Sequence, residues 1–532
     1  MMFRKNVAYL IGIVALTGLS LYLTPVYLWP AIAVVSIAVA SRRVLFALAT
    51  GVIIAAIIIS KGNFVAGLQL AVTRFWAEAT AKDHVYIFGF LLNLGFLIEL
   101  MTHAGAMRAY TRTIGEWLKT RRSVQTTSLL LSSLFFIDDY LSNLLVGNIM
   151  RPLVDIYGIS RVKLAYLLNS MAASFCVLIP ATSWVAMILV QLQISGITEH
   201  TDKNPLILAD PYIAYLSFMP FLFYPALTVF GAWFVVQFGI SWGLMERFER
   251  RAETHASNDD SGVEGSLLDF AVPLGTFIGA IIFGVGFTGG YYLLGGQYSF
   301  LEAVQKADIF AVLFYASLIA VAAALGWYSL RKNNMGKITG IAFLQAISVV
   351  KNSLLLLSLA WTLSSFFRFE LQAGQQLAAY LQAVPFRELI PVLVFLLSAG
   401  ISAITGTAWG TIGLLFPLVI PLVSSLNAPA IAVLTMPLLL PSLAAVISGS
   451  IAGGQISPIA DSVCMSAMSA GAPLLDHVQT QQQYVIPVWI ATIVAYFLVV
   501  FLPFGSLINV TISWILALCI VVSFHLLKNK AR

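Results

Sequence analysis

The sequence predicts an all-α polytopic membrane protein built from inverted repeats, each with a re-entrant hairpin and a discontinuous transmembrane helix. The 532 residues are 60% hydrophobic and only 10% charged, whereas a soluble domain carries about 25% charged residues. Apolar stretches long enough to cross a bilayer recur from one end of the chain to the other. Several of these stretches are interrupted near their centre by carboxylates, hydroxyls, proline or glycine.

Basic residues cluster beside the apolar stretches, which indicates which loops face the cytoplasm. The net charge of +6 is therefore an orientation signal, and no nucleic-acid partner is expected. A first span is expected at residues 6–23, and both termini are expected in the cytoplasm. We predict five regions: N-terminal transmembrane helices and amphipathic segments (1–123), a first repeat core (124–240), a flexible cytoplasmic linker (241–268), a second inverted repeat (269–470) and C-terminal transmembrane helices (471–532).

The first predicted hairpin spans residues 124–150 and contains Asp138 and Asp139, followed by Ser142 and Asn143. Ionisable side chains at membrane depth are costly and usually mark a path for an ion or a substrate. Arginines flank both ends, so both ends are expected in the cytoplasm. A segment of 27 residues cannot cross a ~30 Å hydrocarbon core twice, because each helical pass needs about 20 residues. We therefore expect a re-entrant hairpin that breaks at about residues 138–143.

A discontinuous span is predicted directly after this hairpin. The apolar residues 164–195 are interrupted by Pro180, Thr182 and Ser183. Proline removes a backbone hydrogen-bond donor, and the two hydroxyls lie at the same level of the membrane. Broken helices of this kind line the binding sites of many transporters.

The second half of the chain repeats this plan in the opposite orientation. Residues 389–426 break at TGTAWGT, which contains Thr405 and Thr407, and are expected to form a hairpin that opens to the outside. Residues 429–470 break at GSIAGGQISPIADS, which contains Ser457 and Asp461. A further polar interruption is expected at Lys351. Two hairpins that enter from opposite sides and meet at the midplane are typical of secondary transporters.

Four blocks around these breaks read FFIDDYLSNLLVGNIMRPLVD, IPATSW, ITGTAWGTIGLLFPLVIPL and ISPIADSVCMSAMSAGAPLLDHVQTQ. They resemble motifs of the NhaC-type sodium/proton antiporter family of bacteria, part of a wider superfamily of ion transporters, and the resemblance covers about residues 126–484. It implies a secondary active transporter of the bacterial inner membrane that exchanges sodium, with lithium as a further candidate, for protons by alternating access. Members of that family often carry an acidic residue where this chain has Gly454 and Gln455, which leaves the number of bound cations open.

A sodium ion prefers oxygen ligands, which carboxylates, hydroxyls and freed backbone carbonyls supply. A buried carboxylate without a cation favours its protonated form, and a bound cation favours the ionised form, so one site can hold either a proton or a sodium ion. The predicted site for both is made of Asp138, Asp139, Ser142, Asn143, Thr182, Ser183, Thr405, Thr407, Ser457 and Asp461. The alternatives are structural: one of the two adjacent aspartates caps the second hairpin helix, and Asp461 caps the helix after its break.

Other functions remain open at this stage. The same fold could exchange an organic anion or a drug for sodium or protons, and a cation channel is an alternative of another class. We expect no enzyme and no resident cofactor, because the motifs of ATPases and intramembrane proteases are absent from the sequence. The expected partners are membrane lipid, sodium ions, protons and a small organic substrate, and a homodimer is a further option. Glu99, near one end of a predicted span, is expected to lie at the membrane interface.

Overall fold

The structure is a computed structural model, and it describes most but not all residues of the chain. The described ranges are residues 25–41, 43–106, 118–136, 138–180, 182–199, 205–252, 265–299, 307–331, 335–373, 387–426, 438–502 and 506–530, with isolated positions 303, 306 and 376. The predicted first span at 6–23 lies outside them. Eight helices among the described residues are long and apolar enough to cross a membrane, or nine when one bent pair is counted as a span. These helices confirm the predicted class, an all-α polytopic membrane protein.

The N-terminal region supplies four described helices. They are α2 (Trp29–Ser41), α3 (Val44–Ile59), α4 (Phe64–Ala79) and α5 (Lys82–His103). The α4 helix begins at Asn63, whose side chain accepts a hydrogen bond from the Ala66 amide. It exposes a row of large apolar side chains that includes Phe64, Leu68 and Trp76, as expected for an amphipathic segment at the membrane surface.

The first repeat core contains both predicted breaks. Its helices are α7 (Arg121–Leu134), α8 (Asp139–Ile156), α9 (Arg161–Cys176), α10 (Ser183–Ser195), α11 (Pro211–Phe218) and α12 (Phe223–Gln237). The α7 and α8 helices pack against each other as a hairpin, and the α9 and α10 helices form the discontinuous span. The hairpin breaks between Leu134 and Asp139, which is earlier than the predicted 138–143. A short parallel pair, β1 (Ile197–Thr198) and β2 (Ile207–Leu208), follows α10.

Two segments of this half differ from their predicted form. At the end of the first repeat core, α11 and α12 do not form one straight span but meet at an angle of 53°. The bend occurs at a short 3-10 turn, Met219–Phe221, where Pro220 cannot donate a backbone hydrogen bond. The expected flexible linker begins with a helix, α13 (Gly243–Arg251), which packs against α9 and α23.

The second half carries the same pattern of breaks. Its helices are α14 (Leu267–Thr288), α16 (Ile309–Arg331), α17 (Met335–Ser365), α19 (Ile390–Thr405), α20 (Ala408–Leu426), α21 (Leu439–Ile456), α22 (Asp461–Ala470), α23 (Leu474–Phe501) and α24 (Ser506–Lys530). The α19–α20 hairpin breaks at Gly406 and Thr407, and the α21–α22 span breaks at residues 457–460. Both breaks confirm the prediction. The interruption expected at Lys351 is wrong: α17 continues through this position, where the lysine side chain is exposed and does not compete with the helical hydrogen bonds.

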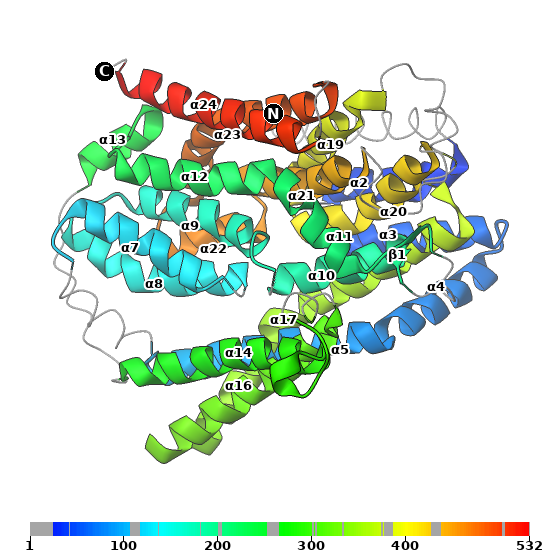
Figure 1. Ribbon diagram of the computed structural model, residues 1–532, viewed down its shortest axis with the longest axis horizontal. Helices are drawn as coiled ribbons and strands as arrows, with labels where there is room; N and C mark the ends of the chain where they lie inside the picture. Colours follow the sequence, from blue (N-terminus) through cyan, green and yellow to red (C-terminus); the bar gives the residue numbers. More distant parts are fainter. Residues whose placement is uncertain are drawn as a thin grey trace, which may run out of the picture.

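Figure 1 shows how these parts are arranged. The α14, α5 and α16 helices lie together along one side of the molecule, and α12, α23 and α24 lie along the other. Between them lie the hairpins and broken spans, with α22 against α8 and α9, and α10 against α20. The broken elements of both repeats therefore meet in the interior of the protein.

The α19 and α21 helices approach each other more closely than ordinary side chains allow. A Cβ atom added at Gly453 would collide with the carbonyl oxygen of Ala399, and one at Gly449 would collide with that of Phe395. Ser402 Oγ also donates a hydrogen bond of 2.6 Å to the Ser450 carbonyl oxygen across this contact. Small residues that allow close backbone approach are a common basis for helix association in membranes.

Candidate functional site

The first hairpin is joined to the first broken span through Asp138. Ser183 Oγ, at the start of α10, donates a hydrogen bond of 2.8 Å to Asp138 Oδ2. The Tyr140 amide donates to Asp138 Oδ1 over 3.0 Å, so this carboxylate also caps the start of α8. One buried side chain therefore fixes both the hairpin break and the helix break of its own repeat.

In the second repeat the hairpin also meets the broken span. Gly406 ends α19 with a φ of 73°, a left-handed conformation that favours glycine. A Cβ atom there would lie 2.7 Å from the Ile459 carbonyl oxygen, inside the break between α21 and α22. Thr407 Oγ1 accepts a hydrogen bond of 3.2 Å from the Gly410 amide and so supports the start of α20.

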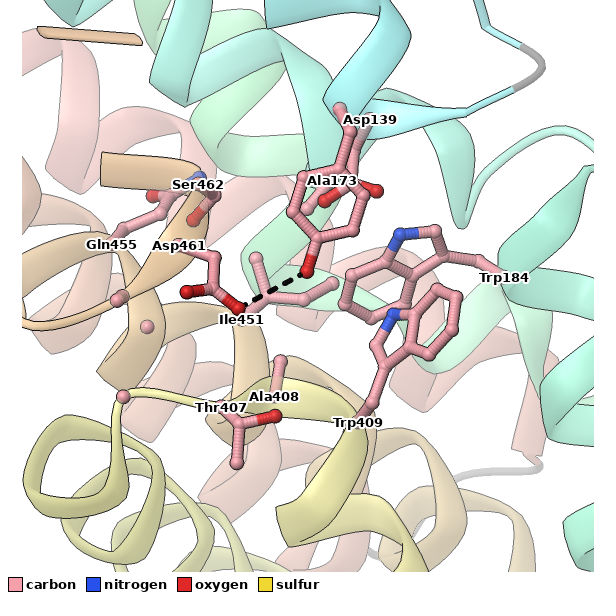
Figure 2. A pocket seen from close by; sticks show the side chains of 14 residues that line it. Asp139, Ala173, Trp184, Thr407, Ala408, Trp409, Ile451, Gln455, Asp461 and Ser462 are labelled. Carbon is pink, nitrogen blue, oxygen red and sulfur yellow. Dashed lines mark hydrogen bonds between the residues drawn. The ribbon is translucent and has the colours of Figure 1, made fainter. Parts of the chain in front are cut away.

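The two repeats touch each other through polar and aromatic side chains. Tyr140 Oη donates a hydrogen bond of 3.4 Å to Asp461 Oδ2, drawn as the dashed line in Figure 2. Beside it, the rings of Trp184 and Trp409 are perpendicular, with centroids 6.0 Å apart. Each of these contacts pairs a residue of the first repeat with a residue of the second, so any movement of one repeat against the other must change them.

A small cavity of about 30 Å³ lies at this junction. Asp139 and Asp461 line it from opposite repeats, together with Thr407 and Gln455 (Figure 2). The volume suffices for a water molecule or an alkali cation. Asp139 is buried, and its Oδ1 atom has no hydrogen-bond partner among the described residues.

Asn143 lies one helical turn beyond Asp139, on the same face of α8. Its side chain is fully buried, and neither its oxygen nor its nitrogen has a hydrogen-bond partner among the described residues. A buried polar group without a partner costs about 1–3 kcal/mol, so such groups are usually satisfied by water or an ion. Asn143 lines neither of the cavities at the junction, and its assignment as a cation ligand stays a prediction.

The remaining predicted site residues mainly support the backbone. Thr182 caps α10 by accepting a hydrogen bond from the Val185 amide, and Thr405 accepts one from the Thr407 amide. Ser457 accepts one from the Ile459 amide within the second break. Ser142 donates to the Ser132 carbonyl oxygen and so ties α8 to α7. Their assignment as cation ligands stays a prediction.

Tyr140 and Gln455 are part of the junction but were not among the predicted site residues. Gln455 Oε1 accepts a hydrogen bond of 2.6 Å from Tyr224 Oη. Its Nε2 donates to the Asn169 carbonyl oxygen and to Ser174 Oγ. The amide therefore uses both its acceptor and its donors to join α21 to α9 and α12. The only sequence signal for Tyr140 was its position directly after the two aspartates.

Two inverted hairpins and two broken helices meet around the buried Asp138 and Asp139 and the more exposed Asp461, an arrangement that defines a secondary transporter of the inverted-repeat class. The sequence profile of the Na⁺/H⁺ antiporter family matches residues 175–501, and the chain belongs to this family. The family resemblance found in the sequence is thereby confirmed. The protein is a membrane transporter and not an enzyme.

Known proteins similar to this chain agree with that class. An uncharacterized protein of Haemophilus influenzae is 29% identical over 486 residues, which is 89% of this chain and 90% of that protein. The structure of Neisseria gonorrhoeae MtrF, which belongs to a class of antimetabolite efflux pumps, gives a TM-score of 0.52 at 12% identity and covers 84% of this chain and 86% of MtrF. The Alcanivorax borkumensis YdaH transporter, described as having an unusual topology, gives 0.53 at 12% identity over 82% of this chain and 89% of its own. At this identity the two structures establish a shared fold.

Proposed function

We propose that the protein exchanges sodium or lithium ions for protons by alternating access. The observation that carries this proposal is the small cavity in which Asp139 and Asp461 come from opposite repeats. Asp139 is held away from bulk water. Such a carboxylate binds either a proton or a cation, because a bound proton removes the charge that attracts the cation and a bound cation disfavours protonation. No resident cofactor is needed for this exchange.

The contacts around the cavity suggest how occupancy is linked to movement. The hydroxyl of Tyr140 reaches the Asp461 carboxylate across the boundary between the repeats. A cation that neutralises the carboxylates would weaken this hydrogen bond, and its departure would restore it. The junction can thus differ between the ion-free protein, in which Asp461 is charged, and the protein loaded with sodium or a proton, in which that charge is neutralised.

The proposed setting is the bacterial inner membrane, with both ends of the chain in the cytoplasm. The supporting observation is the positive charge at the ends of α7 and α24, where Arg121, Arg122 and Lys528 lie. The predicted division into five regions and the optional homodimer belong to the same proposal.

The test uses purified protein in proteoliposomes with a pH-sensitive dye inside. Sodium, lithium, potassium and malate are added in turn to wild type and to Asp138→Asn, Asp139→Asn and Asp461→Asn. We expect sodium to move protons in the opposite direction in wild type, and this response to be lost in Asp139→Asn and in Asp461→Asn. Asp138→Asn should fold, because asparagine can also cap a helix and accept a hydrogen bond from Ser183.

The outcomes separate the proposal from its alternatives. A response to malate but to no alkali cation would mean that the protein transports an organic anion instead of sodium, with the same fold. Sodium flux that moves no protons would indicate a channel. Unchanged exchange in both Asp139→Asn and Asp461→Asn would show that the proposed site does not bind the exchanged ions.

A further inference from the structure

A second and larger cavity lies next to the ion site. Its volume is about 300 Å³, against about 30 Å³ for the first, and it extends between α5, α8, α17, α20 and α22. Tyr140, Trp409 and Asp461 line both cavities. The two spaces are therefore neighbours that share one wall, and the Tyr140–Asp461 hydrogen bond belongs to that wall.

The walls of this cavity combine apolar surface with negative charge. Six of its thirteen lining residues are leucine, isoleucine, valine or methionine, and they come from four helices, α5, α8, α17 and α22. Three carboxyl groups also line it, from Glu99 on α5, Asp138 before α8 and Asp461 on α22. No lysine, arginine or histidine is among the described residues that line it. An organic anion would meet these carboxylates without a counter-charge, whereas an organic cation would find three acceptors.

The volume of the larger cavity and its aromatic residues indicate which class of ligand it can bind. A hydrated or bare sodium ion needs neither about 300 Å³ nor an apolar lining. Small-molecule sites, in contrast, are mostly apolar with a few convergent polar groups, and start at about this volume. Tyr140 and Trp409 add aromatic rings, which attract ammonium groups through their π faces.

We propose that this cavity binds an amphipathic organic cation, with its apolar part against α5 and α17 and its charge near Glu99, Asp138 and Asp461. This proposal rests on the proposed function only in that the cation would share Asp461 with the sodium and proton site. Glu99 has no place in the small cavity, so it is a specificity residue for the organic cation alone.

The experiment measures equilibrium binding of benzyltriethylammonium to the purified full-length protein. This probe carries a fixed positive charge and one aromatic ring, so it neither exchanges protons nor buffers the assay. Benzenesulfonate, with the same ring and a negative charge, tests selection by charge. Tetramethylammonium, with the same charge and little apolar surface, tests selection by the lining.

Two variants locate the binding. Glu99→Gln removes one carboxylate and should weaken benzyltriethylammonium binding about tenfold, equivalent to about 1.4 kcal/mol. Leu144→Trp fills the larger cavity and should abolish binding, because Leu144 lines that cavity and not the small one. Glu388→Gln is the matched control, since this exposed carboxylate lines neither cavity. The melting temperature of every variant is measured as a check on folding, and sodium-driven proton movement is measured beside it.

The results distinguish this proposal from the proposed function. No binding by a wild-type protein that exchanges sodium for protons would overturn the organic-cation site and leave the exchange intact. Binding that Leu144→Trp does not affect, or equal binding of benzenesulfonate, would also overturn it. Binding that depends on Glu99 in a protein without sodium exchange would support this site and refute the proposed cargo.

Discussion

The adjacent aspartates at the tip of the first hairpin have different surroundings. Asp138 accepts hydrogen bonds from Ser183 Oγ and from the Tyr140 amide, and thereby holds two helix starts in place. Asp139 faces the small cavity with one oxygen that has no hydrogen-bond partner among the described residues. The two carboxylates should therefore respond differently to substitution, although they are neighbours in the sequence.

The pH dependence of sodium binding tests the residue that faces the cavity. When one proton competes with one sodium ion for a site, apparent sodium affinity falls by up to about tenfold for each unit of decreasing pH. The measurement is a sodium titration of proton movement at several values between about pH 6 and pH 9, which cover the working range expected for such a site. An apparent affinity that stays constant over this interval would contradict competition at a shared carboxylate.

Tyr140→Phe tests the contact between the repeats. It removes a hydrogen bond of 3.4 Å, which is long, so a loss of no more than about 1 kcal/mol is expected. Apparent sodium affinity should change by about fivefold or less, and exchange should persist. Tyr157→Phe, whose hydroxyl bonds to the Leu118 carbonyl oxygen away from the site, serves as the control. If Tyr140→Phe abolishes exchange and Tyr157→Phe does not, the Tyr140 hydroxyl takes a direct part in proton transfer.

Among the helices, the contact between α19 and α21 supports the second repeat. At Gly449 and Gly453 of α21, the backbone of α19 occupies the space that a larger side chain would need. The α20 helix is enclosed between this pair and the first repeat, and it carries Trp409 to the junction. Separation of α19 from α21 would therefore displace one wall of both cavities.

A matched pair of glycine substitutions tests this contact. Gly453→Ala places a methyl group on the Ala399 carbonyl oxygen and should lower the melting temperature of the purified protein by several degrees, since overpacking costs about 1–3 kcal/mol. Gly400→Ala lies on α19 with open space around the new methyl group, and should be neutral or stabilising. Equal melting temperatures for the two variants would show that close approach of these helices is not required.

Much of this helical arrangement could be predicted from sequence because breaks have local causes. Proline, glycine and clustered hydroxyls located the interruptions before Ser183, at Gly406 and before Asp461. The first hairpin break was predicted too late, because Asp138 caps α8 and the helix restarts directly after it. Lys351 was misread because a long basic side chain can remain exposed without disturbing its helix.

The site itself could be predicted only in part. The carboxylates were visible as charges in apolar sequence, and three predicted residues, Asp139, Thr407 and Asp461, do line one cavity. The neighbours of Gln455 come from α9 and α12, more than two hundred residues away, so no local pattern could reveal that contact. Glu99 lines the larger cavity, which exists only when five helices have packed, so the sequence could not reveal this contact, and its expected place at the membrane interface stays a prediction.

For the molecule as a whole, the proposed alternating access predicts that the helices around α5 move relative to the broken spans. Ile98 on α5 and Cys464 on α22 line the same large cavity from these two parts. A reversible link between them would hold the parts in one arrangement and so prevent the change of access.

This link can be made in an Ile98→Cys chain that also carries Cys519→Ser, which leaves Cys464 and the buried Cys176 as the native thiols. A short bis-methanethiosulfonate should stop sodium-driven proton movement, and a reducing agent should restore it. The same reagent on Cys519→Ser without Ile98→Cys should have little effect. Exchange that continues in a chain shown by mass spectrometry to be fully linked would mean that α5 and α22 move as one body.

The contact between α19 and α21 also bears on the order in which the chain is assembled in the membrane. The α20 helix lies between these two helices in the sequence, and 78% of its most apolar 18-residue stretch is buried inside the protein. The α20 helix packs against α21 more extensively than against α19, the helix with which it forms the hairpin. Because α21 follows α20 in the chain, α20 cannot reach its full burial until α21 has been synthesised and has packed against it.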